Sequence, residues 1–503
     1  MARLWLLLLL LLLLLQLHFL HQVIGSCSLF TESNYVIQSK RIVTHEGIIA
    51  GSVEVREGKI VAISMNDVAS RRYLVPVLNF ENAVIMPGLI DVHVHLNEPG
   101  REDWEGFETG TRAAAAGGLT TLIDMPLNSQ PTTVSKETFE MKVQAAKDKL
   151  FVDVGFWGGL TPENAFNNSA LTELLEAGAL GLKSFMCPSG INDFPMTDKT
   201  HLKAALPVLA KFRRPLLVHA EIVQPLDNID FSLEQRKKYS TYLTTRPSTW
   251  EREAVKELVN VARDTAIGGS AEGAHIHIVH LSDSGESIEL IKEGKAKGLS
   301  LSVETCPHYL SFSSESIPDG DTRFKCAPPI RTEENKRNLW NALQGGDIDF
   351  LSSDHSPAPP ELKLLENGDF LKAWGGISSL QLVLPVTWTH SKVHDVPLEL
   401  ISQWWSSRPA RFAGLENKGS IAIGKDADFV VWDPETSFIV DESLPIYHKH
   451  KITPYAGSRL YGRVIATFVR GQMVYREGHH ASQACGRPLT SSLNEYFATH
   501  RSI

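Results

Sequence analysis

The sequence predicts an α/β fold in which a (β/α)₈ barrel of the TIM type is joined to a smaller β-rich domain made from both ends of the chain. Three observations lead to this prediction. Strand-like apolar runs alternate with amphipathic helical stretches through the middle of the chain, short alternating runs punctuated by glycine occupy both flanks, and eight central strand candidates can be counted. At 503 residues, 43% hydrophobic and 21% charged, the chain is long enough for one large domain and a smaller one.

Residues 1–28 have the features of a secretory-pathway leader. A basic start at Arg3 is followed by a leucine run over 4–15, and small residues stand at 25–28. This pattern is typical of a signal peptide, although the apolar stretch could instead remain as a signal anchor, and a cytosolic leucine-rich helix is the third alternative. We expect entry into the secretory pathway, with residence in the endoplasmic reticulum and membrane contact only through an uncleaved leader.

The β-rich domain is predicted at 33–84 plus 418–476. Runs such as 51–55 and 59–63 are short, alternating and bounded by glycine, as expected for small β-sheet structure. The same pattern of short apolar runs occurs again at 429–432 and 464–469. We therefore expect the two pieces to form one satellite domain, with 477–503 left as a C-terminal tail.

The barrel is predicted at 85–417. Helical spacers fit the gaps between strands, for example 171–177, which Gly178 ends, and 250–263. A doubly wound open sheet is the alternative, but polar residues stand at the C-terminal ends of several non-adjacent strands, where barrel enzymes place their catalytic groups. The strand candidates are 90–95, 120–124, 152–157, 181–185, 215–219, 275–280, 301–305 and 348–354.

Charge and cysteine content limit the possible partners. The net charge of -9 and pI near 6.1 provide no basic field for phosphate backbones, so nucleic acid is not expected. The five cysteines are widely scattered and odd in number, and no disulfide framework can be read from them. One N-glycosylation sequon, at Asn167, would be usable if the chain enters the lumen.

Six side chains with metal-site chemistry stand at strand ends. His93 and His95 are two residues apart in one strand and therefore point to the same face. A single histidine in an apolar run is more often a hydrogen-bonded core residue than a ligand. Four histidines and a carboxylate converging on one barrel mouth instead indicate a hydrolytic metal site. The six residues are His93, His95, Lys183, His219, His280 and Asp354.

Lys183 needs its own explanation, because an ammonium group in that cluster would repel metal ions. Taken alone, a lysine in a strand would be interpreted as a surface residue. Among the histidines, carboxylation by carbon dioxide would convert Lys183 into an anionic carbamate that can bridge two metals. We favour this second interpretation.

Six segments carry a family resemblance: MPGLIDVHVH at 86–95, GLKSFM at 181–186, VHAE at 218–221, IVHLS at 278–282, ETCPHYL at 304–310 and SDHSP at 353–357. Together they resemble the cyclic amidohydrolases, the family that contains dihydroorotases, hydantoinases or dihydropyrimidinases, and allantoinases. The resemblance covers about residues 35–475. It implies a composite β-sandwich next to a metal-dependent barrel.

The resemblance also implies two divalent metal ions, by default zinc, with manganese and cobalt as alternatives. In the family, a metal-bridging hydroxide opens a cyclic amide, and the aspartate at the position of Asp354 takes the proton of the attacking water and passes it to the leaving ring nitrogen. The implied ligands are His93, His95 and Asp354 for one ion, His219 and His280 for the second, and carboxylated Lys183 for both.

The segment LNEPGREDWEGF at 96–107 helps to separate the possible substrates. Dihydroorotases resemble it but carry, in place of Asn97, an arginine that holds the substrate carboxylate. Hydantoinase-like enzymes place a tyrosine shortly after the bridging lysine. The corresponding stretch of this chain reads MCPSG at 186–190 and contains no tyrosine.

Two further segments are similar to the allantoinases: DMPLNS at 124–129 and GINDFPM at 190–196. The leucine-led N-terminus is similar to that of the plant form. A neutral substrate with a ureido arm suits a pocket of amide and hydroxyl groups better than one with a fixed cation. We expect hydrolysis of allantoin, a small molecule, to allantoate. Hydantoinase, dihydropyrimidinase or dihydroorotase activity on another cyclic amide is the alternative.

The candidate substrate-binding residues are Asn97, Cys306, Gly375 and Gly376, although for Cys306 a packing role is at least as plausible as substrate contact. A non-catalytic scaffold of the same fold is a remote alternative, since such proteins lose metal ligands and this chain keeps all six positions. No Gly-x-Ser-x-Gly elbow supports a serine hydrolase. The resemblance makes a homo-oligomer the expected assembly.

Overall fold

The computed structural model describes residues 27–65, 75–226 and 230–490. The leader expected at 1–28 lies outside the described residues, apart from its last two positions. Within the described ranges, no helix has the length and apolar character needed to cross a membrane.

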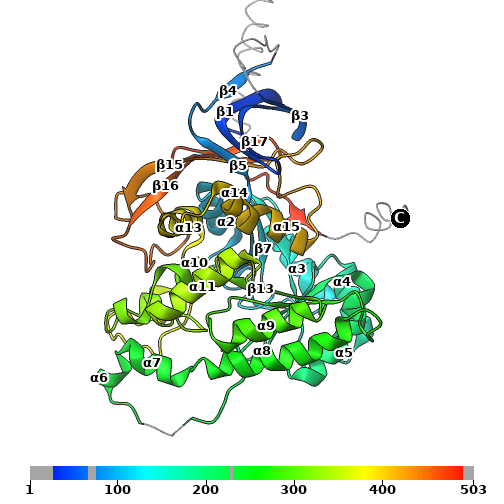
Figure 1. The fold of residues 1–503 in the computed structure, drawn as a ribbon, viewed down its shortest axis with the longest axis vertical. Helices are drawn as coiled ribbons and strands as arrows, with labels where there is room; N and C mark the ends of the chain where they lie inside the picture. The colour runs from blue at the N-terminus through cyan, green and yellow to red at the C-terminus, as the bar shows by residue number, and fades with distance from the viewer. Residues whose placement is uncertain (1–26, 66–74, 227–229, 491–503) are drawn as a thin grey trace, which may run out of the picture.

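The predicted (β/α)₈ barrel is confirmed (Figure 1). Parallel pairing joins β6, β7 and β8 in chain order, and likewise β9 through β14. The third strand position is interrupted at Trp157, with β8 before it and β9 after it. The ring closes where Val94 pairs with His355 just after β14, and where His95 N donates to the carbonyl oxygen of His355 (2.8 Å). The strands are β6 (Leu89–Val94), β7 (Leu119–Asp124), β8 (Asp153–Phe156), β9 (Gly158–Gly159), β10 (Leu182–Phe185), β11 (Pro215–His219), β12 (His275–Ile278), β13 (Leu301–Thr305) and β14 (Phe350–Leu351).

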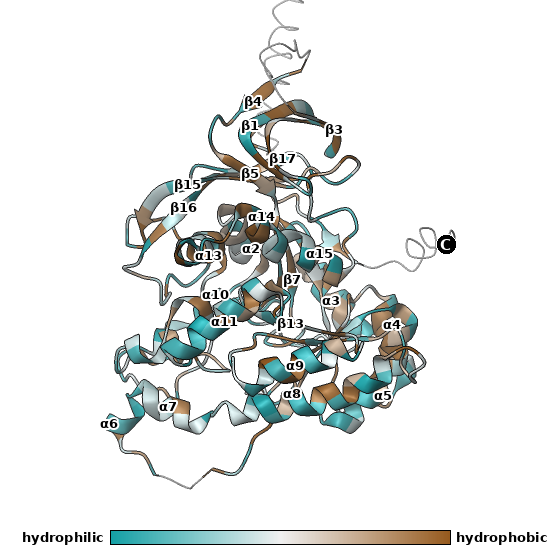
Figure 2. Ribbon diagram, in the orientation of Figure 1, coloured by the Kyte–Doolittle hydropathy of each residue, from teal (hydrophilic) through white to brown (hydrophobic). Residues whose placement is uncertain are grey.

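Amphipathic helices surround the barrel, and α5 and α8 show their mixed hydrophilic and hydrophobic faces in Figure 2. In α8, the buried residues Trp250, Ala254, Leu258 and Val261 recur every three or four positions, which places them on one face of the helix. The larger helices are α2 (Phe107–Ala116), α3 (Lys136–Ala146), α4 (Asn168–Glu176), α5 (Lys199–Phe212), α8 (Thr249–Val261), α9 (Glu286–Ala296), α11 (Glu333–Gly345) and α13 (Val383–Ser391).

Short helical segments occupy the connections between these elements. They are α6 (Leu233–Arg236), α7 (Tyr239–Thr245), α10 (Pro307–Ser311), α12 (Pro360–Lys363), α14 (Leu398–Ser402) and α15 (Arg408–Ala413), the 3₁₀ turns η2 (Ala262–Thr265), η3 (Ser314–Ser316), η4 (Thr322–Phe324), η5 (Leu380–Leu382) and η6 (Lys392–His394), and the π-helical turn η7 (Gln403–Ser407).

Strands from both ends of the chain form one nine-stranded sheet at one end of the molecule, where blue and orange strands lie together in Figure 1. Its central strand β5 pairs with β1 in parallel and with β15 in antiparallel orientation. Tyr35, Ile37, Val431 and Phe468 belong to one buried cluster, so the two chain segments share a core. The strands are β1 (Asn34–Thr44), β2 (Gly47–Arg56), β3 (Lys59–Met65), β4 (Val77–Asn79), β5 (Val84–Pro87), β15 (Phe429–Ile439), β16 (Arg459–Val469), β17 (Gln472–Arg476) and β18 (His479–His480).

The described part of the segment after 476, residues 477–490, contains strands where a tail is predicted, and it carries a disulfide that the sequence does not predict. Strand β19 (Pro488–Leu489) pairs in parallel with β8. Cys27 and Cys485 form a disulfide with a Cα–Cα distance of 5.4 Å across 458 residues of sequence. The expectation that no disulfide could be assigned is therefore corrected. The fold brings Cys27 and Cys485 together from opposite parts of the described chain, which cysteine spacing alone does not reveal.

Candidate active site

All six predicted metal-site side chains meet at the C-terminal mouth of the barrel. His93 lies in β6 and His95 directly follows that strand, while Lys183 lies in β10 and His219 ends β11. The remaining two, His280 and Asp354, follow β12 and β14 by two and three residues. The barrel gathers them because the carboxyl ends of its parallel strands open onto the same face. All six are buried, with exposures between 0% and 7%.

His280 and Asp354 have left-handed backbone conformations, with φ of 38° and 46°. Such conformations cost a β-carbon-bearing residue about 1–3 kcal/mol and persist where the surrounding structure holds them, commonly at functional sites. Here they turn the chain out of the strand at the barrel mouth.

The histidine rings and the carboxylate form one continuous cluster. Asp354 Oδ1 lies 3.3 Å from His93 Nε2 and 3.5 Å from His95 Nε2. The ring of His280 lies 5.2 Å from that of His93 and 4.5 Å from that of His219, measured between centroids. The nitrogen and oxygen atoms of His93, His95 and Asp354 are close enough together to share one metal ion.

Lys183 is fully buried, and its Nζ has no hydrogen-bond partner among the described residues. Burial lowers the pKa of Lys183 to about 7, although Asp354 and Glu304 act in the opposite direction. A substantial fraction of this amine is therefore neutral near pH 7. Only a neutral amine can react with carbon dioxide to form a carbamate.

Two buried glutamates orient the histidines. Glu304 Oε1 accepts from His93 Nδ1 (2.7 Å), and Glu221 Oε2 accepts from His219 Nε2 (2.6 Å). Each contact occupies one ring nitrogen and leaves the other, His93 Nε2 and His219 Nδ1, available as a ligand. Both glutamates lie in the segments that carry the family resemblance, but the sequence alone assigns them no role.

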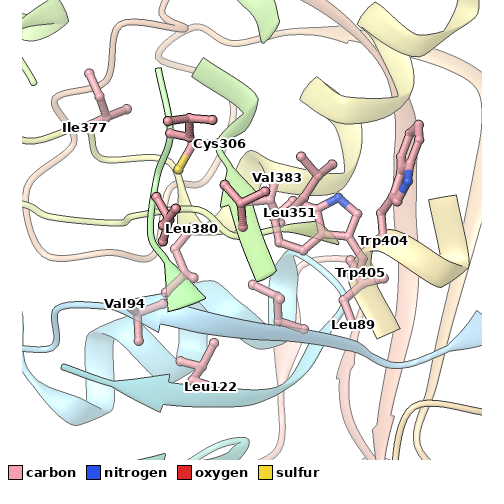
Figure 3. Close-up of a cluster of buried hydrophobic side chains, with 14 of the residues drawn as sticks. Leu89, Val94, Leu122, Cys306, Leu351, Ile377, Leu380, Val383, Trp404 and Trp405 are labelled. Atoms are coloured by element: carbon pink, nitrogen blue, oxygen red, sulfur yellow. The ribbon is translucent and has the colours of Figure 1, made fainter. Parts of the chain in front are cut away.

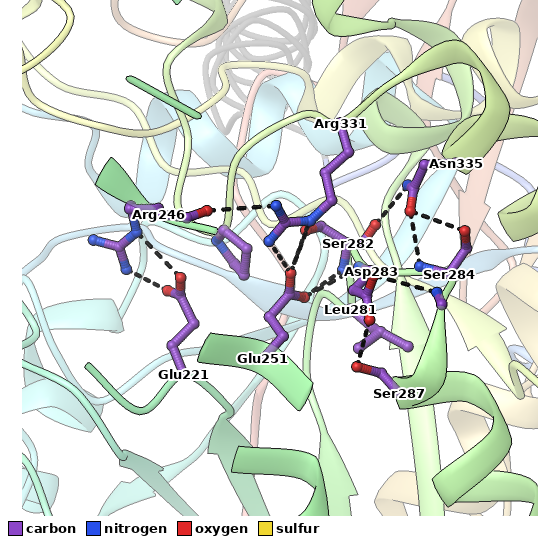
Figure 4. A network of polar contacts seen from close by, with 12 residues as sticks. Glu221, Arg246, Glu251, Leu281, Ser282, Asp283, Ser284, Ser287, Arg331 and Asn335 are labelled. Carbon is purple, nitrogen blue, oxygen red and sulfur yellow. Dashed lines mark hydrogen bonds and ion pairs between the residues drawn. The ribbon is translucent and has the colours of Figure 1, made fainter. Parts of the chain in front are cut away.

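Glu221 is itself held by Arg246, whose Nε donates to Oε1 (3.2 Å) and whose Nη2 donates to Oε2, as Figure 4 shows. Burial alone would raise the pKa of the Glu221 carboxyl, but Arg246 and His219 lower it to about 2. The neighbouring ion pair of Glu251 with Arg331 has a similar form, but Glu251 contacts Ser282 instead of a histidine.

The cluster opens into a cavity of about 490 Å³. Both glycines predicted to contact substrate, Gly375 and Gly376, line it. So do His93, His95, His219, His280 and Asp354, together with Asn128, Tyr242, Arg246, Trp250, Lys325 and Trp374.

Asn97 and Cys306 do not line this cavity. Asn97 is 1% exposed with φ of 65°, and neither amide atom has a hydrogen-bond partner among the described residues. Cys306 lies in the buried hydrophobic cluster of Figure 3, beside residues such as Leu351 and Leu380. This placement agrees with the packing interpretation of Cys306.

The expectation of a cavity without a fixed cation is also corrected, because Arg246 and Lys325 line its wall. They come from the loops after the fifth and seventh barrel strands, β11 and β13.

The predicted sequon lies outside the cavity: Asn167 is exposed at the start of α4, where its side chain accepts from Ala170 N (3.1 Å).

A barrel with this set of histidines, lysine and aspartate at its strand ends has the architecture of a metal-dependent hydrolase. A family model described as "Amidohydrolase family" matches residues 84–474, and one described as "Allantoinase, composite domain" matches residues 30–83. The chain belongs to the amidohydrolase family and, within it, to the allantoinases.

Individual relatives agree with this placement. The chain is 61% identical to the allantoinase of Arabidopsis thaliana over 465 residues, 92% of each protein. It is 42% identical to the allantoinase of Saccharomyces cerevisiae, covering 88% of this chain and 92% of that protein. Among solved structures, the L-hydantoinase from Arthrobacter aurescens superimposes with a TM-score of 0.81 at 28% identity, covering 92% of this chain and 100% of that one.

Proposed function

We propose that this chain hydrolyses the cyclic amide of allantoin to give allantoate. The observation that carries the proposal is the meeting of all six metal-site side chains at the barrel mouth, where five of them line one cavity, in a chain 61% identical to an allantoinase. Allantoinase activity would place the protein in purine catabolism, where ureide nitrogen is released for reuse.

The residues present fit a pair of divalent metal ions. His93, His95 and Asp354 would hold one ion, and His219 and His280 the second, with Lys183 between them as its carbamate. The orphaned, buried Lys183 Nζ and the free ring nitrogens support this assignment. When bound, the metals would supply Lewis acidity at the scissile carbonyl and lower the pKa of the attacking water. Zinc is the default for imidazole and carboxylate ligands, with manganese or cobalt as alternatives.

Asp354 would move the proton. Its carboxylate stands at the cavity wall between His93 and His95. Burial raises the pKa of this carboxyl, but His93 and His95 more than offset that effect and hold it below its ordinary value. Asp354 is therefore ionised at neutral pH and can accept a proton from the attacking water, then deliver it to the leaving ring nitrogen.

A four-substrate assay tests this function. The purified chain without its leader is expected to hydrolyse allantoin much faster than dihydroorotate, hydantoin or dihydrouracil, with metal content measured on the same sample. Equal or faster turnover of dihydrouracil would contradict the proposal and favour a dihydropyrimidinase.

Replacing Glu221 by glutamine is expected to weaken metal binding about 10- to 100-fold, because the contact that orients His219 is altered. The measurement is metal retained after dialysis against graded chelator. Glu251→Gln is the matched control, since Glu251 is an equally buried carboxylate paired with an arginine but without a histidine contact. Equal metal loss in both variants would indicate general destabilisation and contradict a specific role for Glu221.

We further propose that the protein resides in the secretory pathway, in the endoplasmic reticulum. The leader pattern, the exposed sequon at Asn167 and the Cys27–Cys485 disulfide support this location, since disulfides form and persist in oxidising compartments. Peptide mapping of the protein from its own cells, without reduction, is expected to find the Cys27–Cys485 linkage and a glycan on Asn167. Free thiols at both positions together with a bare Asn167 would count against the location.

A further inference from the structure

Lys325 both lines the cavity and holds the loop 371–376, which forms another part of the wall. Its Nζ donates to the carbonyl oxygens of Leu371 (3.1 Å) and Ala373 (2.5 Å), and its own carbonyl oxygen accepts from Gly376 N (2.8 Å). An ammonium group has three N–H donors. One donor of Lys325 is therefore left over after its two loop contacts, on a side chain that faces the cavity.

Lys363 provides a comparison within the same protein. Its Nζ donates to the carbonyl oxygens of Trp374 (3.1 Å) and Gly376 (2.7 Å), so it holds the same loop, but it does not line the cavity. Both lysines are buried, with exposures of 9% for Lys325 and 4% for Lys363. Both residues are buried and donate to carbonyl oxygens of the same loop, but only Lys325 lines the cavity where a ligand would bind.

Among the described residues, no contacting carboxylate neutralises the charge of Lys325, although Asp369 acts on it from a longer distance. Within the described ranges, no carboxylate lies at ion-pair distance from its Nζ, which instead stands 5.2 Å from the centroid of the Tyr242 ring. The other cation of the wall, Arg246, is neutralised by Glu221. Burial, with Arg246 nearby, lowers the pKa of Lys325 to about 8, so the ammonium form still predominates at neutral pH. A largely dehydrated ammonium group with no contacting carboxylate is a strong donor to a ligand oxygen.

We propose that Lys325 binds substrate directly, donating its third N–H to the carbonyl oxygen of the ureido arm of allantoin. This inference rests on the function proposed above. Allantoin carries the arm on the ring carbon next to the scissile carbonyl, so a ring held at the histidine cluster extends the arm into the rest of the cavity. Hydantoin has the same ring without the arm. Lys325 would therefore determine the preference for the arm and contribute little to recognition of the ring.

The test replaces Lys325 by methionine, which keeps the length and apolar stem of the side chain. Loss of a charged hydrogen bond predicts a fall in kcat/KM for allantoin of about 10- to 100-fold. The inhibition constant of hydantoin, measured by competition against allantoin, is expected to change less than about threefold, since hydantoin lacks the partner group. An equal change for both ligands would show that Lys325 acts only through the loop and would overturn the proposal.

Lys363→Met is the matched control, because it removes the other anchor of the loop without removing a side chain that lines the cavity. Its effects on allantoin and hydantoin are expected to be equal. If Lys325→Met does not fold, as judged by its thermal melt, Lys325→Gln takes its place and is held to the same allantoin-to-hydantoin comparison. Failure of the wild-type protein to hydrolyse allantoin would contradict the proposed function itself, whereas turnover with equal losses on both ligands contradicts only the role of Lys325.

Discussion

Lys183→Ala is expected to abolish activity and metal binding together. Lys183 is the one candidate ligand assigned to both metal positions, so its loss removes a shared anion from the centre of the cluster. Several kcal/mol of transition-state stabilisation depend on such a metal pair, which predicts a fall in kcat of about three orders of magnitude or more. Steady-state kinetics and metal analysis of the dialysed protein measure both effects.

Short carboxylic acids are expected to restore part of the activity of Lys183→Ala, because formate or acetate can occupy the space of the missing carbamate. Lys142→Ala is the control: Lys142 in α3 is also buried, but its Nζ contacts Asp124 and the carbonyl oxygen of Met125 and none of the six candidate ligands. That variant should lose stability, and added acid should not rescue it. Unchanged metal occupancy in Lys183→Ala would refute the bridging role.

The strand positions could be predicted because buried parallel strands are short apolar runs with clear ends. The predicted runs 215–219 and 301–305 coincide with β11 and β13. The last run, 348–354, is longer than β14, which covers Phe350–Leu351. The chain leaves the ladder there to place Asp354 at φ of 46° and to let His355 close the barrel against Val94. The strand therefore ends earlier than the predicted run, before the turn at Asp354.

The walls of the cavity could not be predicted in the same way. Arg246 and Lys325 lie in loops whose course depends on the packing of the whole barrel, and no local periodicity marks them. The disulfide could not be predicted for a related reason, since Cys27 and Cys485 are 458 residues apart in sequence and only the tertiary fold brings them together. Glu221, by contrast, could have been noticed in the sequence, because it stands two residues after His219, the same spacing that separates His93 from His95.

Asp354→Asn is expected to separate proton transfer from metal binding. Asparagine has nearly the same shape and keeps an oxygen that can coordinate a metal, but it cannot accept a proton from water. Removing a general base predicts a fall in kcat of about 10²- to 10⁴-fold. Most of the metal should remain, and KM should change little, since the cavity keeps its shape. Kinetics and metal analysis of one preparation check all three expectations.

Asp283→Asn serves as the matched control, because Asp283 is also buried near the barrel mouth but bonds Ser287 Oγ (2.6 Å) instead of histidines. It should retain activity close to that of the wild type. The contrast with Lys183→Ala is the informative comparison, since loss of kcat with metal retained can arise only from chemistry that follows metal binding.

If Asp354→Asn keeps both its metal and its kcat, the proton is carried by another group, and His308 becomes the next candidate. It is fully buried, both of its ring nitrogens lack partners among the described residues, and it interacts electrostatically with Asp354.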